Sequence, residues 1–352
     1  MTVCDKLGRL SYSNPQMNFP DLPALPLPLH FQHLTFSAIK PGPKLIVLGA
    51  VHGNEINGSR SILKYIDEFR TGLRTLVQGS VTFVPFTNPL AVNRQQRNGD
   101  RNLNRNLSLN SDSTDFEDFI AQWLCPLLAS HDVLLDIHSF AQGQQPFALF
   151  GPDNNTGSIE PFNQAEFERG LAFSLGVTRF VDGWLTTYDQ GVQHRLRYAQ
   201  HHDLPVSGLN TSVKYGVGTT EYMRSQGGVA VTLECGQHTD PNGLHVAYQA
   251  IERTLLYLQL INGPMPSAVT NYEHFRLVQV IDKQHVEDQF SQPWHSFDFV
   301  SKQTEIGQRQ SGEIVKAPFD AFIVFPNSNA AAGQEWFYLA QQVHKSKANT
   351  RL

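Results

Sequence analysis

The chain has 352 residues, of which 40% are hydrophobic and 17% charged, with a formal net charge of −5 and a sequence pI of about 6.3. This composition is typical of a globular protein with a hydrophobic core and excludes an intrinsically disordered chain. The sequence contains no basic tract of the kind that binds polyanions, so we expect no nucleic-acid partner.

The cysteines and the apolar runs indicate the compartment. Cys4, Cys125 and Cys235 are odd in number and widely spaced, which suits a reducing environment rather than a disulfide framework. Residues 1–31 lack the charged-then-apolar pattern of a signal peptide. No run of about 18 apolar residues is present. We therefore expect a soluble, cytoplasmic protein without a membrane partner.

Strand-like and helix-like segments alternate over most of the chain. A proline-rich start, with a candidate edge strand within 29–39, precedes this alternation. Apolar runs predict strands at 44–50, 80–86, 132–137 and 228–234. Apolar residues at helical spacing predict helices at 57–73, 115–131, 164–176, 191–202 and 242–261. The alternation predicts an α/β fold: a mainly parallel, doubly wound sheet with helices on both faces.

The pattern changes after the Pro/Gly-containing segment 262–268. Short β-rich runs separated by glycine and proline follow, at 274–281, 297–302, 312–317, 321–326 and 335–340. They predict a small C-terminal all-β domain. We therefore expect two domains, residues 1–265 and residues 266–352.

Three predicted strands end in residues that bind metals or transfer protons. His52 follows the run "LIVLGAV", His138 follows "VLLDI", and Glu234 follows "VAVTL". In doubly wound sheets, ligands bind outside the carboxyl ends of parallel strands. The three side chains are therefore expected to converge, although they lie far apart in the sequence.

His52, Glu55 and His138 form a candidate set of metal ligands. Glu55 lies three residues after His52, so both side chains can reach one ion from a tight turn. Catalytic zinc takes three ligands from His and Asp/Glu and keeps a fourth position for water. A bare His-x-x-Glu match is weak evidence in a chain with 14 histidines. A surface turn with a helix-capping acid, and a core histidine at 138, stay open as alternatives.

Glu234 is a candidate acid–base residue. A charged carboxylate is costly to bury, so it either pairs with a base or works in a cleft. Cys235 points to the opposite side of the same strand. A Cys235–His238 nucleophile pair is the competing interpretation, although a cysteine buried in a strand is usually inert.

The polar segment 88–108 also follows a predicted strand, so it reaches the same edge of the sheet. It carries four arginines: Arg94, Arg97, Arg101 and Arg105. Arginine suits bidentate recognition of carboxylates. Arginines beside a metal site suggest hydrolysis of an anionic substrate.

Four motifs together resemble a known family. "GAVHGNE", "NRQQRNGDRNLNRN", "DIHS" and "TLECG" occur within residues 44–240. In this order they resemble the motifs of the zinc carboxypeptidase superfamily and, within it, of the succinylglutamate desuccinylase/aspartoacylase family. The resemblance implies a zinc-carboxypeptidase-like fold in which residues 1–265 form the zinc hydrolase domain.

The resemblance also implies roles for individual residues. One Zn²⁺ per chain would be held by His52, Glu55 and His138, and Glu234 would act as the catalytic base. Asp136, two residues before His138, is a candidate to orient that histidine. The residues implied to act on the substrate are Arg97, which would polarise the scissile carbonyl, Asn104 and Arg105, which would bind a carboxylate, and Arg224, a second substrate arginine ten residues before Glu234.

The implied function is the zinc-dependent release of an acyl group from a small anionic N-acyl amino acid. A homo-oligomer is compatible with the sequence. Asn102 departs from the acid that aspartoacylases carry at this position, and residues 145–220 match no part of the family pattern. Two alternatives stay open: a peptide-cleaving metallocarboxypeptidase, and a non-catalytic metal- or ligand-binding module.

Overall fold

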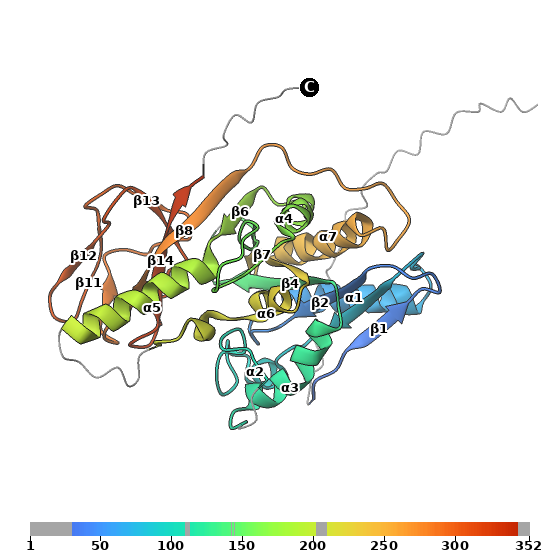
Figure 1. Ribbon diagram of the computed structural model, residues 1–352, viewed down its shortest axis with the longest axis horizontal. Coiled ribbons are helices and arrows are strands. Elements are labelled where there is room, and N and C mark those ends of the chain that lie inside the picture. The colour runs from blue at the N-terminus through green and yellow to red at the C-terminus, as the bar shows by residue number, and fades with distance from the viewer. Residues whose placement is uncertain (1–29, 110–112, 142, 144, 202–209, 344–352) are drawn as a thin grey trace, which may run out of the picture.

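The computed structural model describes residues 30–109, 113–141, 143, 145–201 and 210–343. An eleven-stranded sheet runs through these residues in the order β1-β3-β2-β4-β7-β5-β6-β8-β14-β13-β10 (Figure 1). Helices pack along it, so the predicted mixed α/β class is confirmed.

The strands predicted as buried parallel strands form one end of this sheet. They are β2 (Lys44–Gly49), β3 (Ser80–Val84), β4 (Val133–Phe140) and β7 (Val229–Gln237), and they pair in parallel in the order β3-β2-β4-β7. β1 (Leu34–Ser37) pairs antiparallel with β3 at the edge. Because both faces of the inner strands are covered, these sequences are nearly continuous apolar runs.

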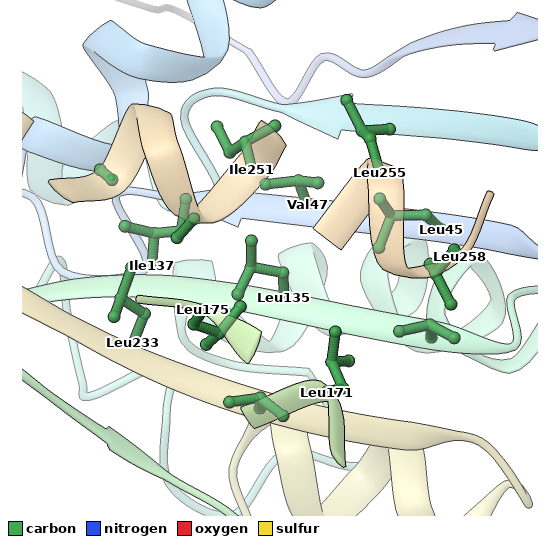
Figure 2. Packing of buried hydrophobic residues seen from close by; sticks show 14 of the residues in the cluster. Leu45, Val47, Leu135, Ile137, Leu171, Leu175, Leu233, Ile251, Leu255 and Leu258 are labelled. Atoms are coloured by element: carbon green, nitrogen blue, oxygen red, sulfur yellow. The ribbon is translucent and has the colours of Figure 1, made fainter. Parts of the chain in front are cut away.

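Helices cover both faces of this parallel part. Along β2, Leu45 and Val47 belong to one core, and Ile46 and Leu48 belong to another, as the alternation of side chains along a strand requires. The first core contains α1 (Asn57–Arg70), α4 (Ala165–Ser174) and α7 (Pro241–Tyr257). Figure 2 shows leucine, isoleucine and valine side chains of this core between strands and helices. The second core contains α3 (Phe116–Ala129) and α6 (Thr219–Ser225).

The middle of the chain supplies elements that the sequence pattern did not predict. β5 (Phe147–Leu149) pairs antiparallel with β7, and β6 (Arg179–Asp182) pairs in parallel with both β5 and β8. α5 (Trp184–His201) begins before the predicted 191–202, whose last residue lies outside the described part of the chain. Other elements that the sequence pattern did not predict include α2 (Pro89–Arg94), the 3₁₀ helix η1 (Val213–Gly216) and α6.

The C-terminal segment is β-rich, as predicted, but most of its strands extend the main sheet. β8 (Glu273–Asp282), β14 (Glu335–Gln342), β13 (Ala321–Val324) and β10 (Phe299–Val300) continue beyond β6. β9 (Gln289–Phe290), β11 (Glu305–Gln308) and β12 (Ile314–Lys316) form a separate small sheet. Because β5 and β6 bridge the two parts, backbone hydrogen bonding crosses the proposed boundary at residue 265. The division into two domains stays a prediction.

No helix in the described residues is long and apolar enough to cross a membrane.

Candidate metal centre and active site

The three predicted strand tips converge at the carboxyl ends of β2, β4 and β7. His52 and Glu55 lie on the turn between β2 and α1, and His138 lies in β4 directly opposite Glu234 of β7. The turn packs closely against α2: a Cβ at Gly53 would lie 2.0 Å from the carbonyl carbon of Ala91. Only glycine allows this approach, which explains Gly53 within the "HGNE" motif.

His52, Glu55 and His138 form a compact buried cluster. One ligand atom from each residue lies within 4.8 Å of the others, and the three residues are 2%, 2% and 4% exposed. Nδ1 of His138 is 2.9 Å from Oε2 of Glu55. The ring centroids of the two histidines are 5.1 Å apart. The structure therefore brings together all three predicted ligands.

The donor atoms of this cluster fit a zinc ion. Nδ1 of His52 is buried and has no hydrogen-bond partner among the described residues, an arrangement that is costly unless something binds there. Burial, followed by the charge of Arg97, lowers the pKa of His52, so this imidazole is neutral and offers a lone pair. Two imidazole nitrogens and one carboxylate form a common ligand set for catalytic zinc.

The electrostatic environment of Glu55 and His138 favours a positive charge between these two side chains. Burial alone would raise the pKa of Glu55, but its electrostatic interaction with the His52 imidazole and the hydrogen bond from His138 bring that pKa well below its ordinary value. Burial would lower the pKa of His138, but Asp136 and Glu55 raise it well above the ordinary value. A metal at this position would displace the proton, since metal ligands bind in their deprotonated form.

Asp136 and Ser139 hold the cluster in place. Nε2 of His138 lies 3.0 Å from Oδ2 of Asp136, so the expected contact between these residues is present. This contact directs Nδ1 of His138 towards Glu55. The backbone N–H of Ser139 donates to Oε2 of Glu55 over 3.1 Å. Such outer contacts fix the orientation and tautomer of ligating histidines.

Glu234 lies beside the cluster as a partly buried residue whose Oε2 is shielded from solvent. Its Oε2 has no hydrogen-bond partner among the described residues. Burial, followed by the charge of Glu55, raises the pKa of Glu234 to about 7. A group with this pKa can both accept and donate a proton near neutral pH, which suits general acid–base chemistry.

The competing Cys235–His238 pair finds no support. Cys235 is fully buried, and burial raises the pKa of its thiol. His238 instead makes contacts with Oγ of Ser139, at 2.8 Å from Nδ1, and with the side-chain amide of Asn54.

Arg97 reaches the cluster from the loop that follows α2. Its Nη1 donates to Oε1 of Glu55 over 3.0 Å, and its side chain is half-exposed, so it faces both the cluster and solvent. The loop is shaped by Glu117 of α3, whose carboxylate accepts the backbone N–H groups of Gly99, Asp100 and Arg101.

Asn104 and Arg105 lie farther along the same loop. Oδ1 of Asn104 accepts the backbone N–H of Thr219 over 2.9 Å. The guanidinium of Arg105 lies over the ring of Trp184, 4.6 Å from its centroid, and Nε is 3.7 Å from Oε1 of Glu335. The positive charge of Arg105 contributes to lowering the pKa of His52, which indicates that Arg105 is near the cluster.

Sequence reasoning missed the residues that surround Arg105. Trp184 comes from α5, and Glu335 and Tyr338 come from β14. The hydroxyl groups of Tyr338 and Tyr188 are buried and have no hydrogen-bond partner among the described residues. No motif marks any of them, because they approach Arg105 only through long-range packing.

The structure does not bring Arg224 to this site. Its guanidinium is buried among three carboxylates, at 2.6 Å from Glu160, 3.4 Å from Glu168 and 2.8 Å from Glu221. It also donates to the carbonyl oxygen of Ala230, four residues before Glu234 on β7. These contacts occupy the guanidinium on another part of the strand, so the expectation of a second substrate arginine at Arg224 loses its geometric basis.

The fold is that of solved succinylglutamate desuccinylases and aspartoacylase-type proteins. A succinylglutamate desuccinylase from Vibrio cholerae aligns with a TM-score of 0.63 and 18% identity, over 86% of this chain and 82% of that chain. The succinylglutamate desuccinylase/aspartoacylase from Rhodobacter sphaeroides aligns with a TM-score of 0.61 and 16% identity, over 87% of each chain. The product-bound ectoine utilization protein EutE (DoeB) from Ruegeria pomeroyi aligns with a TM-score of 0.62 and 16% identity, over 88% of each chain.

The sequence itself points to the same family. Residues 41–151 match the model of the succinylglutamate desuccinylase/aspartoacylase catalytic domain. The family resemblance stated from the motifs is thereby confirmed, and members of this family are deacylase hydrolases. A search of curated proteins finds no match.

Proposed function

We propose that this chain is a zinc-dependent hydrolase that cleaves the amide bond of a small N-acylated amino acid. The observation that carries the proposal is the convergence of His52, Glu55 and His138 with Glu234 at one edge of the sheet. The match of residues 41–151 to a deacylase family supports the same reaction class.

One Zn²⁺ per chain would be held by His52, Glu55 and Nδ1 of His138. When bound, zinc supplies a Lewis acid that polarises a carbonyl group and acidifies water. Nδ1 of His52, which has no hydrogen-bond partner among the described residues, and the two carboxylates that flank His138 would favour a bound cation.

Glu234 would take the proton from the attacking water and deliver it to the leaving amine. Its partly buried position and raised pKa suit both transfers. The half-exposed guanidinium of Arg97 would stabilise the oxyanion that develops on the attacked carbonyl. Because Arg97 is also held by Glu55, its position is fixed before substrate binds.

Arg105 and Asn104 would bind the α-carboxylate of the substrate. Oδ1 of Asn104 is already taken by Thr219, which leaves its amide N–H groups as donors. Among the described residues, the Arg105 guanidinium makes one hydrogen bond, to the carbonyl oxygen of Asn104. The hydroxyl group of Tyr338, which is buried and has no hydrogen-bond partner among the described residues, would add a third donor. Because Trp184 and Glu335 of β14 contact Arg105 and limit the space around it, a small N-acyl amino acid would fit the arrangement better than a polypeptide.

The test combines metal analysis with a hydrolysis screen of the purified chain. We expect one zinc per chain, and hydrolysis of N-acetyl or N-succinyl amino acids rather than of peptides with free carboxyl termini. His138→Ala should lose both metal and activity. A wild-type chain that neither holds nor responds to zinc would refute the proposal, and cleavage of peptides alone would indicate a metallocarboxypeptidase.

A further inference from the structure

Thr219 touches both halves of the proposed site without being a ligand or a base. It is the first residue of α6 and is completely buried. Its hydroxyl group donates to Oδ2 of Asp136, and its backbone N–H donates to Oδ1 of Asn104 over 2.9 Å. One residue therefore connects the carboxylate behind His138 with the amide in the proposed substrate subsite.

The contact with Asp136 matters because that carboxylate has few other partners. Asp136 is 0% exposed, and its Oδ1 has no hydrogen-bond partner among the described residues. Its Oδ2 is shared by Thr219 and by Nε2 of His138. Without the Thr219 hydroxyl group, the Asp136 carboxylate would keep His138 as its one partner within the described part of the chain, and it would be freer to rotate. The orientation of the His138 ring, and therefore the direction in which its Nδ1 points, depends on the orientation of the Asp136 carboxylate.

The contact between the Thr219 backbone N–H and Asn104 determines which end of the Asn104 side-chain amide would face the substrate. Because Oδ1 accepts the backbone N–H of Thr219, the amide N–H groups remain for a carboxylate or carbonyl. The approach is close: a Cβ at Gly218 would lie 2.1 Å from Oδ1 of Asn104. A side chain at residue 218 would therefore push α6 away from the loop that carries Asn104.

The buried network around Arg224 holds α6 in this position. Glu221 accepts the backbone N–H of Gly218 with Oε2 and binds Arg224 with Oε1. Arg224 in turn binds Glu168 of α4, whose carboxylate also accepts the backbone N–H of Ala230 in β7. The N-terminal end of α6 is thus tied to both a helix and a central strand.

We propose that Thr219 is a positioning residue that orients His138 through Asp136 and, at the same time, orients the amide of Asn104. This inference rests on the proposed function and deepens it: the metal half and the substrate half of the site share one support on α6. Thr219 acts through its neighbours and does not contact the reacting atoms.

The hydroxyl group can be removed without changing the shape of the side chain. Thr219→Val keeps the β-branch and the backbone N–H to Asn104 but removes the hydroxyl group, which donates to Asp136 and also lies 3.4 Å from Oδ1 of Asn104. Thr219→Ser keeps the hydroxyl group. Thr254→Val is a matched control, because Thr254 is also completely buried and its hydroxyl group donates to the carbonyl oxygen of Ala250 in α7, away from the site.

The measurement is the dissociation constant of Zn²⁺, obtained by competition with a chromophoric chelator, together with the melting temperature of the metal-free protein. Removal of an outer partner of a ligating histidine typically weakens metal binding 10- to 100-fold, so we expect about tenfold for Thr219→Val. Thr219→Ser and Thr254→Val should bind zinc like the wild type. KM at saturating zinc should change less in Thr219→Val than zinc affinity, because the N–H to Asn104 is kept.

Wild-type zinc affinity in a folded Thr219→Val would overturn the inference, as would an equal loss in Thr254→Val. Should Thr219→Val not fold, Thr219→Ala removes the same donor with a smaller side chain and is judged by the same comparison. A wild type that binds no zinc would overturn the proposed function, and this inference with it. Zinc binding and hydrolysis by the wild type, with unchanged affinity in Thr219→Val, would overturn the inference alone.

Discussion

His138 and Glu234 lie directly opposite each other on the neighbouring parallel strands β4 and β7. The proposed metal ligand and the proposed base therefore need no flexible loop to meet, since their spacing is set by backbone pairing within the sheet. A catalytic arrangement on paired strands is held more rigidly than one on loops. The loop and α6 then add Arg97, Asn104 and Thr219 around this fixed pair.

Glu234→Gln should separate metal binding from catalysis. The change keeps the shape of the side chain but removes the proton acceptor, so zinc content should stay normal. General acid–base catalysis is worth about 10²- to 10⁴-fold, and kcat should fall by at least this range. Cys235→Ala is the control and should keep most of the activity. Near-normal turnover in Glu234→Gln, combined with a large loss in Cys235→Ala, would favour the nucleophile pair instead.

Arg97→Ala should lower kcat much more than it lowers zinc content. Arg97 is half-exposed and is held by Oε1 of Glu55, so its removal leaves the three ligands in place. Loss of one donor to a developing oxyanion typically costs about 10²- to 10³-fold in kcat. Steady-state kinetics and metal analysis should be compared with Arg70→Ala, an exposed arginine on α1. Loss of zinc in step with activity would show instead that Arg97 mainly supports Glu55.

Arg105→Ala should weaken recognition of the substrate carboxylate. The comparison uses one N-acetyl amino acid and its α-amide, which differ only in the negative charge. A hydrogen bond to a charged group contributes about 1.5–3 kcal/mol, so kcat/KM for the acid should fall roughly 10- to 150-fold. Activity on the amide should change less, and Tyr338→Phe should show the same preference in milder form. An equal loss on both substrates would remove Arg105 from carboxylate binding.

The metal cluster could be predicted because the local sequence determines where its residues lie relative to the strand ends. Each apolar run predicts a buried strand, and the residue at its carboxyl end is placed at the common edge without knowledge of distant contacts. His52, His138 and Glu234 follow directly from this rule, and Glu55 follows from the tight turn after β2.

The rest of the site could not be predicted, because it depends on contacts between segments far apart in the chain. Trp184, Thr219 and Glu335 lie in elements with no recognisable motif and approach the loop of Arg105 only in the folded state. Arg224 is the reverse case, in which a sequence pattern points to the site but the side chain lies elsewhere. Its spacing from Glu234 suggested a substrate role, but α6 turns its side chain towards Glu160 and Glu168.

Arg224→Met should therefore act on stability rather than on substrate preference. It removes the cation between three carboxylates, and leaving buried charges unpaired typically costs about 3–5 kcal/mol. Arg169→Met is the control, because its ion pair with Asp153 lies at the surface and should contribute at most about 1 kcal/mol. Chemical denaturation of both variants measures the free energies of unfolding. Wild-type stability in Arg224→Met, with an altered preference between N-acetylaspartate and N-acetylleucine, would restore its assignment as a substrate arginine.

The stability loss in Arg224→Met should grow as the pH rises. Burial raises the pKa of Glu160 and of Glu168 above the ordinary value of 4.5, and the charge of Arg224 opposes this shift. A carboxyl group with a raised pKa stays protonated to a higher pH in the folded chain than in the unfolded chain. The contribution of such a carboxyl group to the free energy of unfolding is therefore complete below pH 4.5 and is lost as the pH rises through its pKa in the folded chain.

Without Arg224 the pKa values of Glu160 and Glu168 rise further, so ionising these two groups in the folded chain destabilises it more. The difference in unfolding free energy between wild type and Arg224→Met should thus be small near pH 4 and larger at pH 7 to 8. A difference that stays constant, or that widens towards acid, would show that the carboxylates are not the groups that Arg224 stabilises.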